Sequence, residues 1–475
     1  MIDIGKVAVI GAGTMGAAIA AHVANAGVKV RLLDIATTNG ANRNAVAESA
    51  LDRLLKTELA PFMHRRDVEL VAVGNIDDDI GLIADCDWII EAIVERIDAK
   101  RALYEKIEQA RRPGSIVSSN TSTIPLATLL EGSADRFAAD FLITHFFNPP
   151  RYMRLLEVVA SSRTREDAIA SIERFADMRL GKTVVRAKDT PGFIANRIGI
   201  YWLQCGVVRA FDAGLTVEEA DAALGRPMGA PKTGVFGLLD LVGLDLMPHV
   251  LASMAAALPD DDPFHGVFRQ PPVIQRMITE GYTGRKGKGG FYRLRPDTLE
   301  RVKEALDLAR GEYRATHKAS LKSVSASRKH GLRALLDHPD KGGRYAWWVL
   351  SRTLSYAARL APQIADDVVA IDDAMRLGYN WKHGPFELID QLGADWFVRR
   401  LRDSGLTVPP LLELAKGRPF YRAEAGRRAH LGIDGSYRDV VRPPGILLLA
   451  DIKRRKRPLA RNRSASLWDI DDGVA

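Results

Sequence analysis

The sequence has little cysteine, no spaced metal-binding motif and no apolar run long enough to cross a bilayer. Its two cysteines, Cys86 and Cys205, are expected to be free thiols in a reducing compartment rather than parts of a disulfide scaffold. Its ten histidines show neither HExxH nor CxxC-type spacing, which predicts no metal site. The absence of a long apolar run argues against a membrane partner, and a first strand starting at Lys6 leaves no room for a signal peptide, so we expect a cytoplasmic protein.

The formal net charge of +8 is concentrated near the end of the chain, where Lys453 to Arg463 contains seven basic residues and no acidic one. Such a run usually forms a solvated linker. Because no nucleic-acid-reading motif accompanies it, we expect no nucleic-acid partner. A length of 475 residues with 47% hydrophobic content predicts about three domains with ordinary packed cores.

The N-terminal segment carries the pattern of a dinucleotide-binding unit. The apolar strand KVAVI leads into GAGTMG and a helix of small residues. Gly11 permits the tight turn, Gly13 lets a pyrophosphate approach the backbone, and Gly16 lets the helix pack on the strand. Met15 lies in the same loop and is an expected cofactor contact. The alternative is a glycine-rich turn of some other α/β protein.

The end of the next predicted strand indicates which dinucleotide is bound. VKVRLLD ends in Asp34, 18 residues after Gly16. A carboxylate there accepts hydrogen bonds from the adenine-ribose hydroxyls and repels a 2′-phosphate. The sequence therefore predicts NAD rather than NADP.

A histidine and a glutamate lie on consecutive predicted strands. HFFNPPRYMRLLEV places His145 at the end of one apolar strand and Glu157 inside the next. Histidine titrates nearest neutral pH, and a carboxylate on one ring nitrogen orients the ring and stabilises its protonated form. The pair predicts a proton-transfer site with His145 as general base. A core histidine with a surface glutamate is the alternative, and the hydride acceptor implied by the glycine loop argues against it.

Polar side chains follow several strands of the first 186 residues, where apolar runs alternate with helical patterns as in a doubly wound parallel sheet. They are Glu91 and Glu95, Asn120 and Ser122, and His145, with Lys100 opening the helix after the first pair. Ligands of such sheets bind outside the carboxyl ends of the strands. We therefore expect these groups to meet in one crevice.

A long apolar helix is predicted to start at Thr190-Pro191. Asn196 lies on its first turns. An amide in an apolar run is costly unless it forms a hydrogen bond, either to a substrate oxygen or to a neighbouring helix. Both interpretations of Asn196 stay open.

The later half of the chain contains an internal repeat. GVFGLLDLVGLD (Gly234 to Asp245) returns as GPFELIDQLGAD (Gly384 to Asp395), and an acidic helical segment precedes each copy. A duplicated helical unit is the simplest explanation. The second copy has no counterpart of Asn196, so we expect it to pack rather than react.

These patterns predict an α/β Rossmann-type domain followed by two all-α domains. The expected boundaries are 1–186 for the NAD-binding domain, 187–293 for the first helical domain, 294–343 for a linker, 344–432 for the second, degenerate helical domain and 433–475 for a basic linker. The closing SASLWDIDDGVA alternates apolar and polar residues and is typical of the start of a further domain. A frayed terminus is the alternative.

Five ordered motifs, GAGTMG, EAIVER, SNTST, HFFNPP and DTPGFIANR, make the chain resemble the L-3-hydroxyacyl-CoA dehydrogenases of fatty-acid β-oxidation from Lys6 to about Tyr292. The duplicated part resembles multifunctional members that also carry an enoyl-CoA hydratase module. The resemblance implies NAD-dependent oxidation of an L-3-hydroxyacyl-CoA to the 3-ketoacyl-CoA, with His145 as base and Glu157 as its partner.

The resemblance also implies roles for further residues. Ser122 and Asn196 hydrogen-bond the reacting substrate. The residues that contact the cofactor are Glu95, Lys100, Ser122 and Asn148, to which the predicted crevice adds Asn120. Ser49 and Lys56, on an amphipathic helix expected over Arg43 to Leu59, match positions that contact CoA in single-activity members.

Three other functions share part of this pattern: a dehydrogenase of a free hydroxy acid such as gulonate, a non-catalytic NAD-sensing protein, and a crystallin-like structural protein. Single-copy members of the family pair through their helical units, so a second copy in the same chain would favour a monomer with an intramolecular pseudo-dimer. The expected partners are an acyl-CoA substrate and a hydratase or thiolase module.

Overall fold

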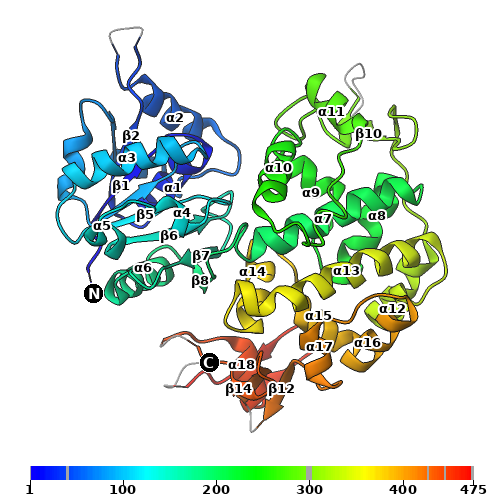
Figure 1. The fold of residues 1–475 in the computed structure, drawn as a ribbon. Coiled ribbons are helices and arrows are strands. Elements are labelled where there is room, and N and C mark those ends of the chain that lie inside the picture. Colours follow the sequence, from blue (N-terminus) through cyan, green and yellow to red (C-terminus); the bar gives the residue numbers. More distant parts are fainter. Residues whose placement is uncertain (1, 39–41, 296–301, 425–426, 443–444, 472–475) are drawn as a thin grey trace. The chain divides into compact units, whose positions relative to one another are not determined.

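The computed structural model describes residues 2–38, 42–295, 302–424, 427–442 and 445–471. The chain divides into two compact units (Figure 1). The first unit comprises Met1–Tyr201, Asp245–Phe268 and Asp373–Asn380, and the second comprises Trp202–Leu244, Arg269–Asp372 and Trp381–Ala475. Two short segments from later in the sequence therefore belong to the same unit as the N-terminal region.

An eight-stranded sheet with the order β3-β2-β1-β4-β5-β6-β7-β8 forms the centre of the first unit. Its strands are β1 (Lys6–Ile10), β2 (Lys29–Asp34), β3 (Val71–Asn75), β4 (Trp88–Glu91), β5 (Ile116–Ser119), β6 (Phe141–Phe146), β7 (Leu155–Val159) and β8 (Thr183–Arg186). Neighbouring strands are parallel except for β6 and β7. Every residue of β4, β5, β6 and β7 is buried, as expected for a sheet covered on both faces.

Strand β7 departs from the expected parallel sheet. A parallel crossover needs about a dozen residues or more, and residues 147–154 are too few to make one. The chain therefore turns back, and β7 pairs antiparallel with β6. In this register His145 lies directly opposite Glu157. The departure from the predicted topology is what brings the two predicted residues together.

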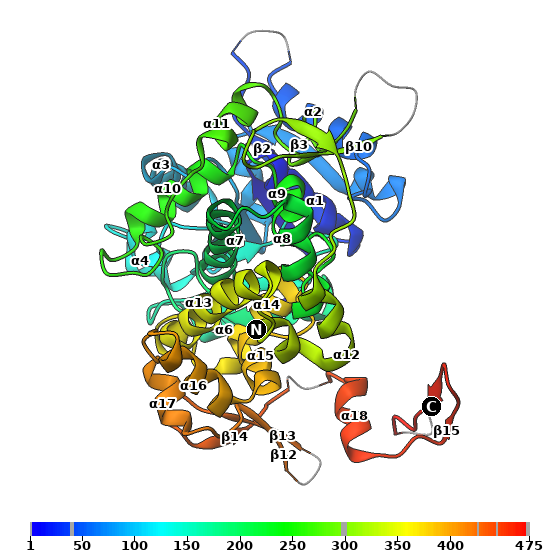
Figure 2. The same cartoon turned by 90° about the vertical axis from the view of Figure 1, so that its right-hand side faces the viewer.

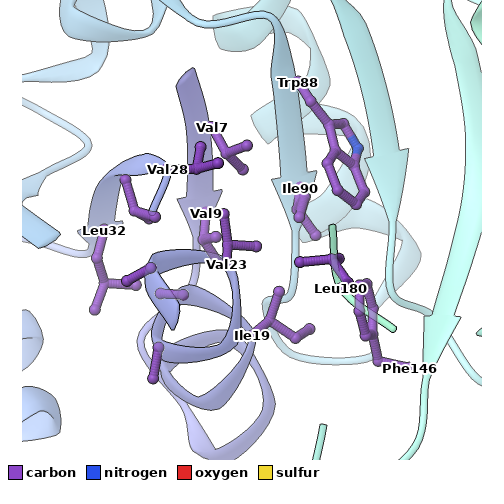
Figure 3. Close-up of a cluster of buried hydrophobic side chains, with 14 of the residues drawn as sticks. Val7, Val9, Ile19, Val23, Val28, Leu32, Trp88, Ile90, Phe146 and Leu180 are labelled. Carbon is purple, nitrogen blue, oxygen red and sulfur yellow. The ribbon is translucent and has the colours of Figure 1, made fainter. Parts of the chain in front are cut away.

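Helices connect the strands of the sheet. They are α1 (Thr14–Asn25), α2 (Ala45–Lys56), α3 (Ile97–Ala110), α4 (Leu126–Leu129), α5 (Asp135–Ala139) and α6 (Glu166–Met178), with 3-10 turns η1 (Arg65–Leu70) and η2 (Ile80–Asp85). The first unit also contains α10 (Met247–Ala257). The small residues of α1 are buried from Gly16 to Ala24. Ile19 and Val23 of α1 share one apolar cluster with Val7 and Val9 of β1 (Figure 3). This packing fixes the loop between β1 and α1.

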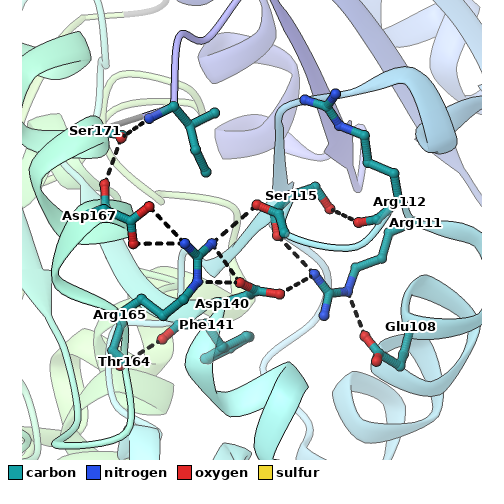
Figure 4. A network of polar contacts seen from close by, with 12 residues as sticks. Glu108, Arg111, Arg112, Ser115, Asp140, Phe141, Thr164, Arg165, Asp167 and Ser171 are labelled. Carbon is teal, nitrogen blue, oxygen red and sulfur yellow. Dashed lines mark hydrogen bonds and ion pairs between the residues drawn. The ribbon is translucent and has the colours of Figure 1, made fainter.

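A buried ion-pair network lies at the amino ends of β5 and β6 (Figure 4). Arg111 donates to Asp140 at 2.7 Å and to the carbonyl of Ser115 at 2.8 Å. Arg165 lies 2.6 Å from the other oxygen of Asp140. Because buried charges are stable only when paired, the network supports the sheet at the edge opposite to the carboxyl ends of these strands.

Helix α7 (Ala195–Asp212) runs from the first unit into the second, which is mostly helical. The other helices of the second unit are α8 (Val217–Leu224), α9 (Phe236–Val242), α11 (Pro272–Thr279), α12 (Lys322–Leu336), α13 (Lys341–Ile364), α15 (Pro385–Leu392), α16 (Ala394–Asp403), α17 (Pro410–Ala415) and α18 (Leu449–Arg455), with the 3-10 turn η3 (Arg226–Met228). Helix α14 (Val368–Gly378) begins in the second unit, and its part from Asp373 onward belongs to the first. Helix α13 contacts α8, α12, α15 and α17 and is central in the second unit (Figure 2).

The second unit also contains strands, so the expected all-α domains are corrected. β9 (Tyr292–Leu294), β10 (Lys303–Leu306) and β11 (Tyr313–Ala315) form one antiparallel sheet, β12 (Tyr421–Glu424), β13 (Arg427–Leu431) and β14 (Tyr437–Asp439) form another, and β15 (Ala460–Arg461) pairs with β16 (Ser466–Leu467). The first sheet and α12 occupy much of the expected linker 294–343. Ala305 and Leu306 of β10 are buried, and Arg293 pairs with Glu304 across the strands at 2.9 Å. The predicted linker 433–475 holds β14, α18 and the β15-β16 hairpin, with its last four residues outside the described part.

The repeated segments share local geometry. Asp221 accepts hydrogen bonds from two consecutive N–H groups of α9 at 2.8 and 3.1 Å, and Asp372 does the same at α15 at 2.8 and 3.1 Å. A Cβ on Gly234 would lie 2.4 Å from the Cα of Asp221, and one on Gly384 would lie 2.3 Å from the Cα of Asp372. Each glycine therefore lets an aspartate cap the helix that follows it.

Cys86 and Cys205 are buried thiols rather than halves of a disulfide, and burial raises the pKa of the Cys86 thiol to about 12. In the described part of the chain, no single helix is long and apolar enough to cross a membrane. Helices α9 and α10 reach the required length and apolar composition only when they are counted together, across the bend between them.

Candidate active site

The glycine loop has the geometry that a dinucleotide requires. Gly11 has φ +109°, and a Cβ there would lie 2.4 Å from the carbonyl oxygen of Ala92. A Cβ on Gly16 would lie 1.8 Å from the carbonyl oxygen of Gly11, so α1 approaches the loop as closely as it does only without a side chain. Gly13, by contrast, has open space out to 4 Å. Met15 is half-buried and packs against the core cluster. The loop thus leaves Gly13 accessible to a pyrophosphate.

A cavity of about 410 Å³ opens beside this loop. Gly11, Gly13 and Asp34 line it together with apolar side chains, among them Ile35 and Ile76. The Asp34 carboxylate accepts hydrogen bonds from the N–H of Ala12 and, at 2.6 Å, from that of Ile35. Asp34 therefore orders the glycine loop as well as presenting a carboxylate at the cavity.

A buried ion pair follows β4. The Nζ of Lys100 lies 2.6 Å from Oε1 of Glu91 and 3.2 Å from Oε2 of Glu95. Glu91 is fully buried and also accepts hydrogen bonds from Tyr104 at 2.8 Å and from Ser119 at 2.6 Å. Lys100 is only 1% exposed, so in this structure its charge is held between two carboxylates.

Glu95 fixes the loop after β5. It accepts hydrogen bonds from the Thr121 hydroxyl and from the N–H groups of Ser122 and Thr123 at 3.0 and 3.2 Å. Burial opposes its ionisation, but the Lys100 ammonium and the hydrogen bonds from Thr121 and Ser122 outweigh burial and hold the pKa of Glu95 below its ordinary value. The ionised Glu95 therefore orients Ser122.

Asn120 and Ser122 tie this loop to the end of β6. The Oδ1 of Asn120 accepts a hydrogen bond from the N–H of Phe146 at 2.9 Å. The hydroxyl of Ser122 lies 3.2 Å from Nε2 of His145. Polar groups from the ends of β4, β5 and β6 therefore meet at one edge of the sheet, as the sequence predicts.

The His145–Glu157 pair is buried and held on both sides. Nδ1 of His145 lies 2.8 Å from Oε2 of Glu157. The other carboxylate oxygen, Oε1, accepts hydrogen bonds from the N–H groups of Ile194 and Ala195 at 3.1 and 2.8 Å. The start of α7 therefore solvates the Glu157 carboxylate, and helix N-termini favour negative charge. With Glu157 accepting at Nδ1, Nε2 is the nitrogen left to exchange a proton.

Helix α7 begins later than predicted, at Ala195 rather than at Thr190-Pro191. Phe193 has φ +48° in the left-handed region, which an α-helix cannot contain and which a non-glycine residue rarely adopts. This turn directs the two N–H groups toward Glu157. Asn196 is the second residue of the helix, and it is half-buried rather than fully enclosed by apolar side chains. It directly follows the residue that donates to Glu157.

The structure leaves other predicted residues apart from the pair. Ser49 and Lys56 are exposed on α2, and Asn148 is exposed in the loop after β6. Within the described residues, none of the three forms a hydrogen bond with His145 or Ser122.

Sequence reasoning missed several contributors. The backbone of Ile194 and Ala195 carries no side-chain motif, and Phe147, whose ring centroid lies 4.6 Å from that of His145, resembles any core aromatic. The segment Asp373–Asn380 also belongs to this unit. The buried Tyr104, which donates to Glu91, was also missed. Of these contributors it alone had a sequence pattern that could have indicated it, because it follows Lys100 at helical spacing.

A glycine-rich dinucleotide loop and a buried histidine–carboxylate pair at the carboxyl ends of one sheet define a dinucleotide-dependent oxidoreductase. The sequence profile of the 3-hydroxyacyl-CoA dehydrogenase NAD binding domain matches residues 6–190, and that of the 3-hydroxyacyl-CoA dehydrogenase C-terminal domain matches residues 192–294 and 346–411. The chain therefore belongs to the 3-hydroxyacyl-CoA dehydrogenase family, and its cofactor is NAD.

Curated relatives and a solved structure agree with this assignment. A probable 3-hydroxyacyl-CoA dehydrogenase of Bacillus subtilis is 37% identical over 99% of this chain and 62% of its own length. A putative fatty acid oxidation complex trifunctional enzyme of Rickettsia felis is 36% identical over 94% of this chain and 61% of its own length. The crystal structure of 3-hydroxybutyryl-CoA dehydrogenase from Escherichia coli K12 is 25% identical, with a TM-score of 0.64, over 87% of this chain and 98% of that chain. The chain thus spans about three fifths of the two curated relatives.

Proposed function

We propose that this chain oxidises L-3-hydroxyacyl-CoA to 3-ketoacyl-CoA with NAD in fatty-acid β-oxidation, and that His145 is the general base and Glu157 its partner. One observation carries the proposal: the imidazole lies between Glu157 at 2.8 Å and Ser122 at 3.2 Å. This is the edge of the sheet at which β1 ends and leads into the dinucleotide loop. The names of the relatives support the acyl-CoA class of substrate.

The proton transfer follows from the hydrogen bonds of His145. Glu157 holds the hydrogen on Nδ1, so Nε2 takes the proton of the substrate hydroxyl in the oxidative direction. The imidazolium that forms is stabilised by the Glu157 carboxylate. When bound, NAD supplies the acceptor for the hydride that leaves the substrate carbon. In the reductive direction His145 returns the proton.

Other side chains orient the reactants in this proposal. The hydroxyl of Ser122 and the amide of Asn196 hold the substrate oxygen beside Nε2, which contributes orientation rather than bond breaking. Glu95, Lys100, Asn120 and Asn148 act on the cofactor side. Exposure of Ser49 and Lys56 on α2 leaves both available to CoA.

Kinetics on the purified chain test the proposal. Acetoacetyl-CoA with NADH should be turned over, and gulonate with NAD should not; the opposite preference would favour the free hydroxy acid. His145→Ala should abolish most turnover and leave NADH binding intact. His330→Ala, which removes an exposed histidine of the second unit, is the matched control and should behave like wild type.

We also propose that the helical part is duplicated and that the chain is a monomer whose second copy covers the first. The same family profile matches residues 192–294 and 346–411, and the paired Asp221 and Asp372 caps support the duplication. Tyr345 of the second copy donates to the carbonyl of Gly206 at 3.0 Å, a buried contact between the two copies. Light scattering that shows an obligate dimer would contradict this assembly.

Hydratase or thiolase activity, suggested by the trifunctional relative, is proposed to come from a partner module. The pure chain should then fail to hydrate crotonyl-CoA. Measurable hydration would place that activity within these residues.

A further inference from the structure

The end of α14 contacts the surroundings of the proton-transfer pair, although the repeat places α14 in the second copy. A Cβ on Gly378 would lie 2.8 Å from Cδ2 of Leu155 and 3.3 Å from Cβ of Ala195 and from Cε1 of Phe147. Leu155 precedes Glu157 by two residues in β7, Ala195 donates to Glu157, and Phe147 lies against His145. Gly378 therefore touches three residues that enclose the pair.

The next residue packs on α7 itself. A Cβ on Gly199 would lie 1.9 Å from Cζ, 2.2 Å from Cε2 and 2.4 Å from the hydroxyl oxygen of Tyr379. The ring therefore lies directly on the helix backbone. Gly199 is one turn beyond Asn196, on the same face of α7. Burial, with a further contribution from the Glu157 charge, raises the pKa of Tyr379, so the phenol also lies within the field of that carboxylate.

The chain leaves α14 in a conformation that holds this contact. Asn380 has φ +54°, in the left-handed region that ends helices, and its Nδ2 lies 3.6 Å from Sδ of Met153 in the loop after β6. The segment is thus held at Gly378, Tyr379 and Asn380 against α7, β7 and the loop that follows His145.

We propose that Tyr379 is a positioning residue for the His145–Glu157 pair. Its ring braces the first turns of α7 and, through the N–H groups of Ile194 and Ala195, holds the Glu157 carboxylate against the imidazole. The second copy is then part of the catalytic arrangement and not only a packing surface. This inference rests on the proposed role of His145 and Glu157.

Paired size changes at Gly199 and Tyr379 test it in the full chain. Gly199→Ala adds a methyl group where the ring lies, so the start of α7 must shift, and displacements of about 1 Å near reacting groups lower turnover by up to about 10²-fold. We expect kcat for acetoacetyl-CoA reduction to fall, with KM for NADH little changed. Tyr379→Ala removes the brace and should also lower kcat. The double variant should recover part of the loss, because the methyl group enters the vacated space.

A pH profile separates positioning from simple packing. Weaker contact with Glu157 removes stabilisation of the protonated imidazole that forms during oxidation, so the pH dependence of kcat should differ from wild type in Gly199→Ala and Tyr379→Ala. Tyr379→Phe keeps the ring and should restore what Tyr379→Ala loses. Gly206→Ala is the matched control on α7: its Cβ would lie 2.7 Å from Val235, so it should lower Tm without moving the profile.

The outcomes distinguish the two proposals. If both Gly199→Ala and Tyr379→Ala change only Tm, as Gly206→Ala does, while His145→Ala is inactive, the inference about Tyr379 is wrong and the proposed function stands. If wild type does not reduce acetoacetyl-CoA, or His145→Ala is fully active, the proposed function fails and the inference fails with it. A shifted profile with recovery in the double variant supports the inference.

Discussion

Glu157→Gln changes one atom of the proposed proton-transfer pair and leaves its volume unchanged. Glu157 accepts three N–H hydrogen bonds, at 2.8 Å from His145 and at 3.1 and 2.8 Å from the start of α7. Glutamine has a single oxygen. It can accept from α7 or from His145, and its NH₂ group must face the other partner.

The cost of each arrangement decides the outcome. With the NH₂ group facing α7, two buried N–H groups lose their acceptor, at about 1–3 kcal/mol each. With the NH₂ group facing His145, α7 stays satisfied, and the imidazole must instead carry its hydrogen on Nε2. We expect the second arrangement, in which the base has lost its free lone pair. Turnover should then fall about 10²–10⁴-fold, which corresponds to about 2.7–5.4 kcal/mol of activation free energy.

Steady-state oxidation of 3-hydroxybutyryl-CoA by NAD measures this loss. NADH affinity, followed by fluorescence titration, should stay close to wild type, because the pair moves a proton and does not hold the dinucleotide. Glu105→Gln, on the exposed face of α3, is the matched control. A Glu157→Gln variant with wild-type kcat, or one that loses NADH affinity in proportion to kcat, would refute the assignment.

Three further changes test the cofactor site and the fold. Gly13→Ala should weaken NADH binding with Tm unchanged, because its Cβ meets open space. Gly16→Ala should lower Tm as well, because its Cβ would lie 1.8 Å from a backbone oxygen. Equal Tm values for the two variants would contradict the loop geometry. Asp34→Ala should weaken NADH and relax discrimination against NADPH, and an unchanged preference in competition assays would remove Asp34 from the ribose. Burial lowers the pKa of Lys182 to about 7, below about 10.4 in the unfolded chain. Between these values the folded protein binds fewer protons than the unfolded chain, so stability should rise with pH, and Lys182→Met should flatten the dependence of Tm on pH across that window.

Much of the site could be predicted because its parts are local. GAGTMG lies between a strand and a helix that are consecutive in the chain, and Asp34 ends the following strand. His145 and Glu157 are joined by a loop too short for a crossover, so their strands can only lie side by side. The short strands β9 to β14 were missed. Their polar-apolar alternation is brief and lies near turns, so it is only a weak signal for strands in a region that is mostly helical.

The sequence by itself determined the glycine loop between β1 and α1, the place of Asp34 at the end of the next strand and the pairing of His145 with Glu157, since each depends on residues close in the chain or on a periodic pattern. Tertiary structure alone decided that Glu157 is held by the backbone of α7 and that Tyr379 packs on Gly199. These contacts join segments far apart in sequence, and many apolar surfaces could satisfy the same burial. Which surfaces meet depends on the packing of the whole unit, and no local motif specifies it.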